Sequence, residues 1–157
     1  MPINDIAQEH LDALINRLPF PGGIAFRQEL DGANLNFTMP SLARVDALLD
    51  GVRTRLHPTF DDFLERDDNQ NFLHALCFYT GATVALSSRQ SIDWYTYDEM
   101  ITVFPDNAAM FPNCFATHIS CVLSRGGFFI PLSSLQERLF DEPPGKSVKF
   151  SAEMFVK

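Results

Sequence analysis

The stretch Asn71–Leu86 reads NFLHALCFYTGATVAL and predicts the central helix of the fold. Its polar side chains after Asn71 are those of His74, Thr80 and Thr83. A helix that is apolar on nearly all sides is normally buried. The stretch is shorter than the ~20 apolar residues that a membrane span needs. We therefore expect a buried central helix over about residues 69–89, enclosed by the rest of the chain.

Length and composition indicate one domain that spans residues 1–157. The chain has 157 residues, which is an ordinary size for a single domain. Its residues are 46% hydrophobic and 20% charged, so a globular fold is expected rather than disorder. Phenylalanine occurs 15 times, and because this side chain offers no polar chemistry, its abundance points to core or interface.

The charge of the chain narrows the classes of partner. The formal net charge of −8 argues against nucleic acid, because phosphates are bound by clustered Lys and Arg. It equally argues against docking on an anionic membrane surface. A basic protein partner is compatible with this charge.

The cysteines and the N-terminus predict a cytoplasmic protein. Three cysteines, an odd and low number, fit a reducing compartment better than a disulfide framework. The segment MPINDIAQEH has neither the basic nor the apolar region of a secretory signal. Neither observation calls for a cofactor, and we expect none.

Helical patterns dominate the first half of the chain. Apolar residues recur at helical spacing over residues 3–18 and 41–56, and a short acidic helix is expected over 59–68. Between the first two helices, residues 23–38 alternate at both ends around Asp31-Gly32, which favours a β-hairpin.

The second half has the character of strands. Strands are expected over residues 91–99, 114–124 and 128–132, and the alternating segment 147–156 should close the sheet. Met100–Phe104 reads either as another strand or as the start of a helix, and a short helix should follow Ser133 or Ser134. Because helices precede strands, the sequence predicts an α+β fold, with N-terminal helices packed on a mostly antiparallel C-terminal sheet.

Three segments together resemble a pattern found in small uncharacterised bacterial proteins. These are SLARVDALLD, NFLHALCFYTGATV and FFIPLSSLQERLFDEP. The residues that carry the resemblance are Ser41, Leu42, Asp46, Leu48, Asn71, Phe72, Tyr79, Gly81, Pro131 and Leu132. The resemblance implies a cytoplasmic bacterial domain without a transferable activity. Some small acidic bacterial proteins of this kind are immunity proteins that neutralise toxins.

The segment SIDWYTYDE is the candidate binding site. Along a strand, Asp93, Tyr95, Tyr97 and Glu99 would project to one side, and Trp94, Thr96 and Asp98 to the other. Aromatic rings beside carboxylates suit the recognition of a partner, because Trp and Tyr supply contact area and a hydrogen bond. The alternative is that Trp94 belongs to the core and the tyrosines line a sheet face. The candidate residues are Asp93, Trp94, Tyr95, Tyr97, Asp98 and Glu99.

Two further sets of residues are candidates for chemistry, although their sequence patterns are weaker. Cys114, His118 and Cys121 are zinc-type ligands, with His74 or Cys77 as a fourth. The alternative is two buried cysteines and a hydrogen-bonded histidine.

Cys77 and His74 would lie near each other on the central helix as a nucleophile and its base. A buried cysteine is normally inert, and no catalytic motif accompanies the pair.

The sequence thus favours a non-enzymatic interaction domain, of the immunity type, that neutralises a basic partner. The alternative is a small ligand-binding protein or enzyme with a pocket between the central helix and the sheet, containing His74 or Asp98. A third hypothesis is a homo-oligomer in which the final strand, residues 147–156, pairs across subunits.

Overall fold

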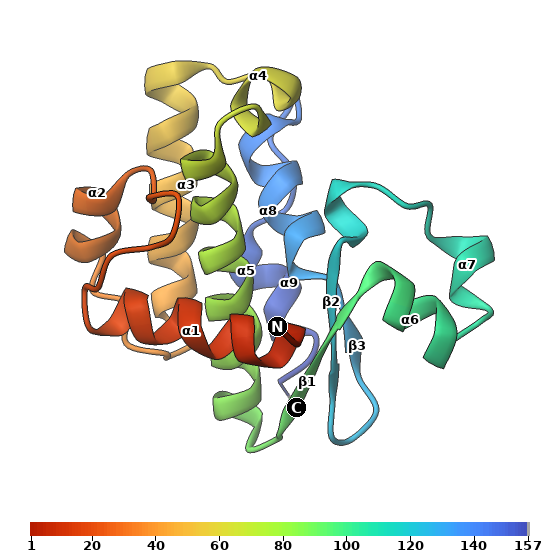
Figure 1. Ribbon diagram of the computed structural model, residues 1–157. Coiled ribbons are helices and arrows are strands. Elements are labelled where there is room, and N and C mark those ends of the chain that lie inside the picture. The colour runs from red at the N-terminus through yellow and green to blue at the C-terminus, as the bar shows by residue number, and fades with distance from the viewer. Residues whose placement is uncertain (157) are drawn as a thin grey trace.

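The computed structural model describes residues 1–156, and the long helix α5 (Asp67–Ser88) runs through its centre (Figure 1). Thirteen of its 22 residues are buried, as the apolar stretch predicts. Gly81 marks the tightest contact, because a Cβ atom there would overlap the Trp94 ring. Glycine therefore lets the tryptophan approach the helix backbone.

Helices enclose α5 on several sides (Figure 1). Those of the first half are α1 (Ile3–Ile15), α2 (Arg27–Gly32), α3 (Ser41–Leu56) and α4 (Phe60–Leu64). Two more, α8 (Pro131–Phe140) and α9 (Val148–Glu153), come from the end of the chain. Tyr79 of α5 joins this shell to the core, since its hydroxyl bonds to Ser41 and accepts from the Phe37 N–H.

A three-stranded antiparallel sheet packs beside the helices, so the fold is α+β as predicted. Its order is β1 (Ile92–Thr96), β2 (Ile119–Leu123), β3 (Phe128–Phe129). The register pairs Trp94 with Cys121, and Cys121 with Phe129. All three side chains are buried in the main hydrophobic core, so this face of the sheet is its inner face.

Residues 97–118, which we call the arm, connect β1 to β2. Residues 97–110 extend away from the helices, and residues 115–117 return to pack on α8 (Figure 1). The arm contains α6 (Tyr97–Val103), α7 (Asn107–Met110) and the 3-10 turn η1 (Phe115–Thr117). The predicted strands over 91–99 and 114–124 are therefore too long.

The first of these strands ends because Thr96 caps a helix. The Thr96 hydroxyl accepts from the Glu99 N–H, and the Glu99 carboxylate accepts from the Thr96 N–H. This reciprocal capping box starts α6. The third predicted strand is also shortened, because Pro131 begins α8.

The predicted hairpin over residues 23–38 is wrong, because this segment contains α2. Phe26 takes a left-handed conformation, and the helix begins at Arg27. The Arg27 guanidinium donates to the carbonyl of Ala13, in the last turn of α1, and to that of Leu18, just after this helix. It also pairs with Asp31 one turn later, which a hairpin would not allow.

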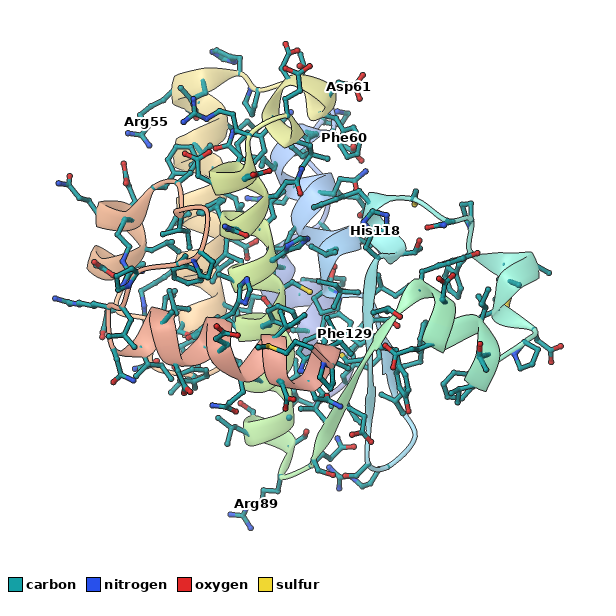
Figure 2. The ribbon with its side chains drawn as sticks, in the orientation of Figure 1. Arg55, Phe60, Asp61, Arg89, His118 and Phe129 are labelled. Atoms are coloured by element: carbon teal, nitrogen blue, oxygen red, sulfur yellow. The ribbon has the colours of Figure 1, made fainter. Side chains whose placement is uncertain are left out.

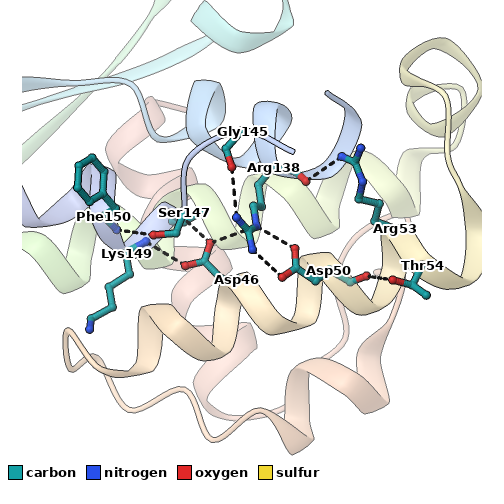
Figure 3. A network of polar contacts seen from close by, with 10 residues as sticks. Asp46, Asp50, Arg53, Thr54, Arg138, Gly145, Ser147, Lys149 and Phe150 are labelled. Atoms are coloured by element: carbon teal, nitrogen blue, oxygen red, sulfur yellow. Dashed lines mark hydrogen bonds and ion pairs between the residues drawn. The ribbon is translucent and has the colours of Figure 1, made fainter. Parts of the chain in front are cut away.

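The predicted closing strand over residues 147–156 is also wrong, because α9 occupies it. The Ser147 hydroxyl accepts from the Phe150 N–H, and the Asp46 carboxylate accepts from the N–H groups of Val148 and Lys149 (Figure 3). A buried carboxylate on the first free N–H groups stabilises a helix start. The proposed pairing of this segment as a strand across subunits therefore has no strand to use.

An ion-pair network fixes α8 against α3 (Figure 3). Arg138 donates to both oxygens of Asp50, at 2.7 and 2.8 Å, and to the carbonyl of Gly145. Arg53 donates to the carbonyl of Arg138. Burial raises the pKa of the neighbouring Asp46, while its backbone hydrogen bonds oppose that rise. These contacts give Asp46 and Asp50 structural roles in holding the C-terminal segment.

No helix within residues 1–156 combines the length and the apolar character that a membrane crossing requires.

Candidate interaction surface

The sheet has an outer face that looks away from the main core. Tyr95 of β1 pairs with Ser120 of β2, and Val122 pairs with Phe128 of β3. These four residues alternate with the inward-facing ones, so they project to the opposite side. Helix α6 covers this face, since it contacts both β1 and β2. Helix α6 is thus a second layer on the outer face of the sheet.

An aromatic cluster joins the arm to the outer face. The Phe104 ring meets Tyr95 and Phe128 edge to face, with centroids 6.3 and 6.2 Å apart. Phe111 lies 5.7 Å from Phe128, and the buried Met100 lies outside the main core cluster. Edge-to-face pairs of this kind stabilise by about 0.5–1.5 kcal/mol each beyond area burial. The arm therefore has its own small core and a defined position.

Beyond this cluster the arm exposes apolar side chains in an acidic setting. Val103 is 52% exposed and Met110 is 70% exposed. The carboxylates of this region are exposed and belong to Asp93, Asp98, Glu99 and Asp106. No Lys or Arg occurs between residues 90 and 124. Solvent-facing apolar groups framed by one sign of charge are typical of a protein-binding surface.

The aromatic candidates turn out to be mainly structural. Trp94 is 4% exposed and packs edge to face on Phe78 of α5, with centroids 5.0 Å apart. Tyr95 is half-buried under Phe104, and the Tyr97 hydroxyl donates to the carbonyl of Phe111. Tyr97 therefore ties α6 to the far side of the arm. The expected alternation ends with the strand at Thr96.

The acidic candidates divide into two kinds. Asp93 and Asp98 are exposed, and their carboxylates form no hydrogen bond or ion pair to another described residue. Glu99 is exposed as well, but its carboxylate completes the capping box of α6. Asp93 and Asp98 are therefore the members of the predicted set that are free to meet a partner.

Comparison of the chain with protein-family models, with curated proteins and with solved structures gives no match. The resemblance of three segments to bacterial immunity-type proteins therefore stays a prediction.

The zinc candidates are not brought together. Cys114 is exposed, whereas Cys121 is buried and directs its thiol to the Phe129 carbonyl. His118 is exposed and lies beside Phe115. Within the part of the chain that the structure describes, no three Cys, His, Asp or Glu residues converge as a metal site.

The Cys77–His74 pair, in which Cys77 is buried and His74 is half-buried, is unsuited to catalysis. Cys77 is fully buried, and burial raises the pKa of its thiol well above its usual value, so the thiol stays protonated. Burial, with His10 and His118 nearby, lowers the pKa of His74 to about 4. The His74 ring stacks on Phe115, with centroids 5.6 Å apart. Neither residue meets the needs of a nucleophilic site.

Sequence reasoning missed the apolar members of the surface, Val103 and Met110. One sequence signal could have found the helix that carries Val103, because Thr96-x-x-Glu99 is a capping-box pattern that predicts a helix start after the strand. A helix there would have placed Val103 and Phe104 on different faces. No sequence signal indicates which face packs on the sheet.

Proposed function

We propose that this protein is a non-enzymatic binding domain whose arm docks a basic protein partner in the cytoplasm. By this proposal it acts as an immunity-type protein, and it neutralises its partner by covering a basic surface. The acidic arm, which has exposed Val103 and Met110 and contains no Lys or Arg, is the observation that carries the proposal.

Charge and burial both support the arm as the docking surface. Its carboxylates would attract a basic partner from a distance, while desolvation of the apolar side chains would supply affinity. The aromatic cluster beneath fixes the arm before binding, which lowers the entropic cost of association. The other acidic segment, α4, lacks exposed large apolar side chains of this kind.

The test compares two charge reversals with the same change in net charge. Asp98→Lys/Asp106→Lys alters the arm, and Asp61→Lys/Asp62→Lys alters α4 as a matched control. Each protein is immobilised and exposed to extract from the native host, and bound proteins are eluted with increasing salt. We expect a basic protein to bind the wild type and the α4 variant, and the arm variant to lose it.

The proposal fails if the wild type captures only background, or if both variants retain the same protein equally. Circular dichroism of the two variants checks that each remains folded. Val103→Ser/Met110→Ser should weaken the same complex without a change in net charge. That second variant separates apolar docking from general attraction between opposite charges.

A second candidate is a small ligand-binding protein with a site between α5 and the sheet. A hollow of about 360 Å³ lies where α1, α5 and β1 meet. Its lining includes Asn4, Ala7, Gln8 and Leu11 of α1, Ala82, Ala85 and Leu86 of α5, and Ile92 and Trp94 of β1. It contains neither His74 nor Asp98, so the residues expected to act in such a site do not line it. This arrangement favours the protein-binding proposal.

A further inference from the structure

A groove of about 850 Å³ lies between α2 and α3, apart from the arm and the sheet. Ala47, Leu48, Gly51 and Val52 of α3 contribute its mainly apolar lining. Arg55 stands at this outer side of α3, away from the sheet (Figure 2). The volume is within the range of about 300–1,000 Å³ that holds a small molecule.

Two glycines line the groove, and neither the backbone conformation nor a neighbouring atom requires glycine at these positions. Neither Gly32 nor Gly51 has a positive φ, and a Cβ atom on either would meet nothing within 4 Å. A glycine inside a helix such as α3 is destabilising relative to alanine. This is the reverse of Gly81, where a neighbouring ring requires the space. The room above Gly51 is therefore available to a molecule from outside.

Arg44 supplies a fixed positive charge on the wall of the groove. Its Nε and Nη2 atoms both donate to the Asn34 carbonyl, at 3.1 and 2.9 Å, and Nη2 also donates to Asn36. These neutral acceptors orient the guanidinium but leave its charge uncompensated. Among the described residues, no carboxylate lies within ion-pair distance of Arg44.

The other charges on the groove are already paired. Arg55 forms an ion pair with Glu29 at 3.1 Å, and Asp50 forms one with Arg138 at 2.7 Å. The groove as a whole therefore combines an apolar lining with one unneutralised cation, Arg44. An occupant that complements both features has an apolar body and one negative charge.

We propose that the α2–α3 groove binds an amphiphilic monocarboxylate of the fatty-acid class. The carboxylate pairs with the guanidinium of Arg44, and the acyl chain covers Leu48 and Gly51. The groove shares no residue with the arm, so this proposal is tested independently of the proposed protein partner.

The test measures the binding of decanoate to the full chain by titration calorimetry, below the concentration at which the ligand forms micelles. Decanol and decyltrimethylammonium serve as neutral and cationic probes of the same chain length. Arg44→Gln removes the charge, and Gly51→Leu fills the groove. Arg89→Gln is the matched control, because Arg89 is exposed at the far end of α5 (Figure 2).

We expect decanoate to bind the wild type and Arg89→Gln equally. Binding should weaken by about tenfold or more in Arg44→Gln, which is the effect of one charge-assisted contact. Gly51→Leu should lose binding, while its melting temperature stays equal or rises, since leucine favours the helix and has room. A decanoate complex that decanol matches in affinity would contradict the role of Arg44.

The proposal is overturned if decanoate does not bind the wild type at millimolar concentration, or if Arg44→Gln binds as tightly as wild type. It is also overturned if Gly51→Leu retains full affinity, because the acyl chain would then lie elsewhere. Pull-down of the protein partner by the arm is a separate readout. Loss of either activity leaves the other unaffected.

Discussion

Helix α5 and the arm are both rich in apolar residues, but the fold uses them in opposite ways. In α5 most residues are buried, and the close approach at Gly81 is matched to a neighbouring ring. In the helices α6 and α7 of the arm, Met100 is the buried residue, and Val103 and Met110 face solvent. Composition alone does not separate these regions. The difference in burial indicates which apolar residues hold the fold and which are free to bind.

The largest effect should come from truncating the core of α5. Leu76 is fully buried, and Leu76→Ala should lower the free energy of unfolding by about 2–5 kcal/mol, through lost burial and the cavity left behind. Met110→Ala, on the exposed arm, should change it by about 0.5 kcal/mol or less. Urea denaturation of both variants measures the contrast. Equal losses would mean that the arm is part of the main core.

Acid should weaken the α5 core through His74. In the unfolded chain its pKa is near the ordinary value of 6.5, and in the fold it is lowered to about 4 by burial and by His10 and His118. The contribution to stability is therefore complete above pH 6.5, and it is lost as the pH falls from 6.5 to 4 because the unfolded state binds the proton first. The loss should reach about 3 kcal/mol at pH 4.

Denaturation of wild type and His74→Leu across this pH range isolates the effect. Between pH 6.5 and 4 the free energy of unfolding should fall less in the variant than in the wild type, and the difference should equal the loss expected from His74. His57→Asn is the control, because His57 is exposed and asparagine tolerates its left-handed backbone. Parallel pH curves for wild type and His74→Leu would show that His74 does not titrate in this way.

A smaller effect than either of these losses should come from the helix cap in the arm. Thr96→Ala removes the capping box of α6 and should cost about 1 kcal/mol. Hydrogen exchange should become faster in α6 while the amides in the middle of α5 keep their protection. Uniform acceleration in both helices would indicate that the arm and the core unfold as one unit.

The candidate site was only partly predictable from the sequence. The segment Asp93–Glu99 does lead into the proposed surface, and Asp93 and Asp98 are exposed there. The alternative interpretation of Trp94 was that it belongs to the core, and the structure buries it there. Val103 and Met110 were missed, because a short apolar helix does not reveal which face it buries. That choice depends on the outer face of a sheet formed by residues distant in the chain.

Local patterns in the sequence were enough to predict the buried central helix, the helix over residues 41–56 and the two strands that flank residues 125–127. Each is specified by local periodicity or turn chemistry, which short-range interactions are enough to enforce. Tertiary structure alone decided that residues 27–32 and 148–153 are helical. The Arg27 side chain binds the carbonyls of Ala13 and Leu18, and the Val148 N–H binds Asp46 of α3. These contacts outweigh a local preference for strands.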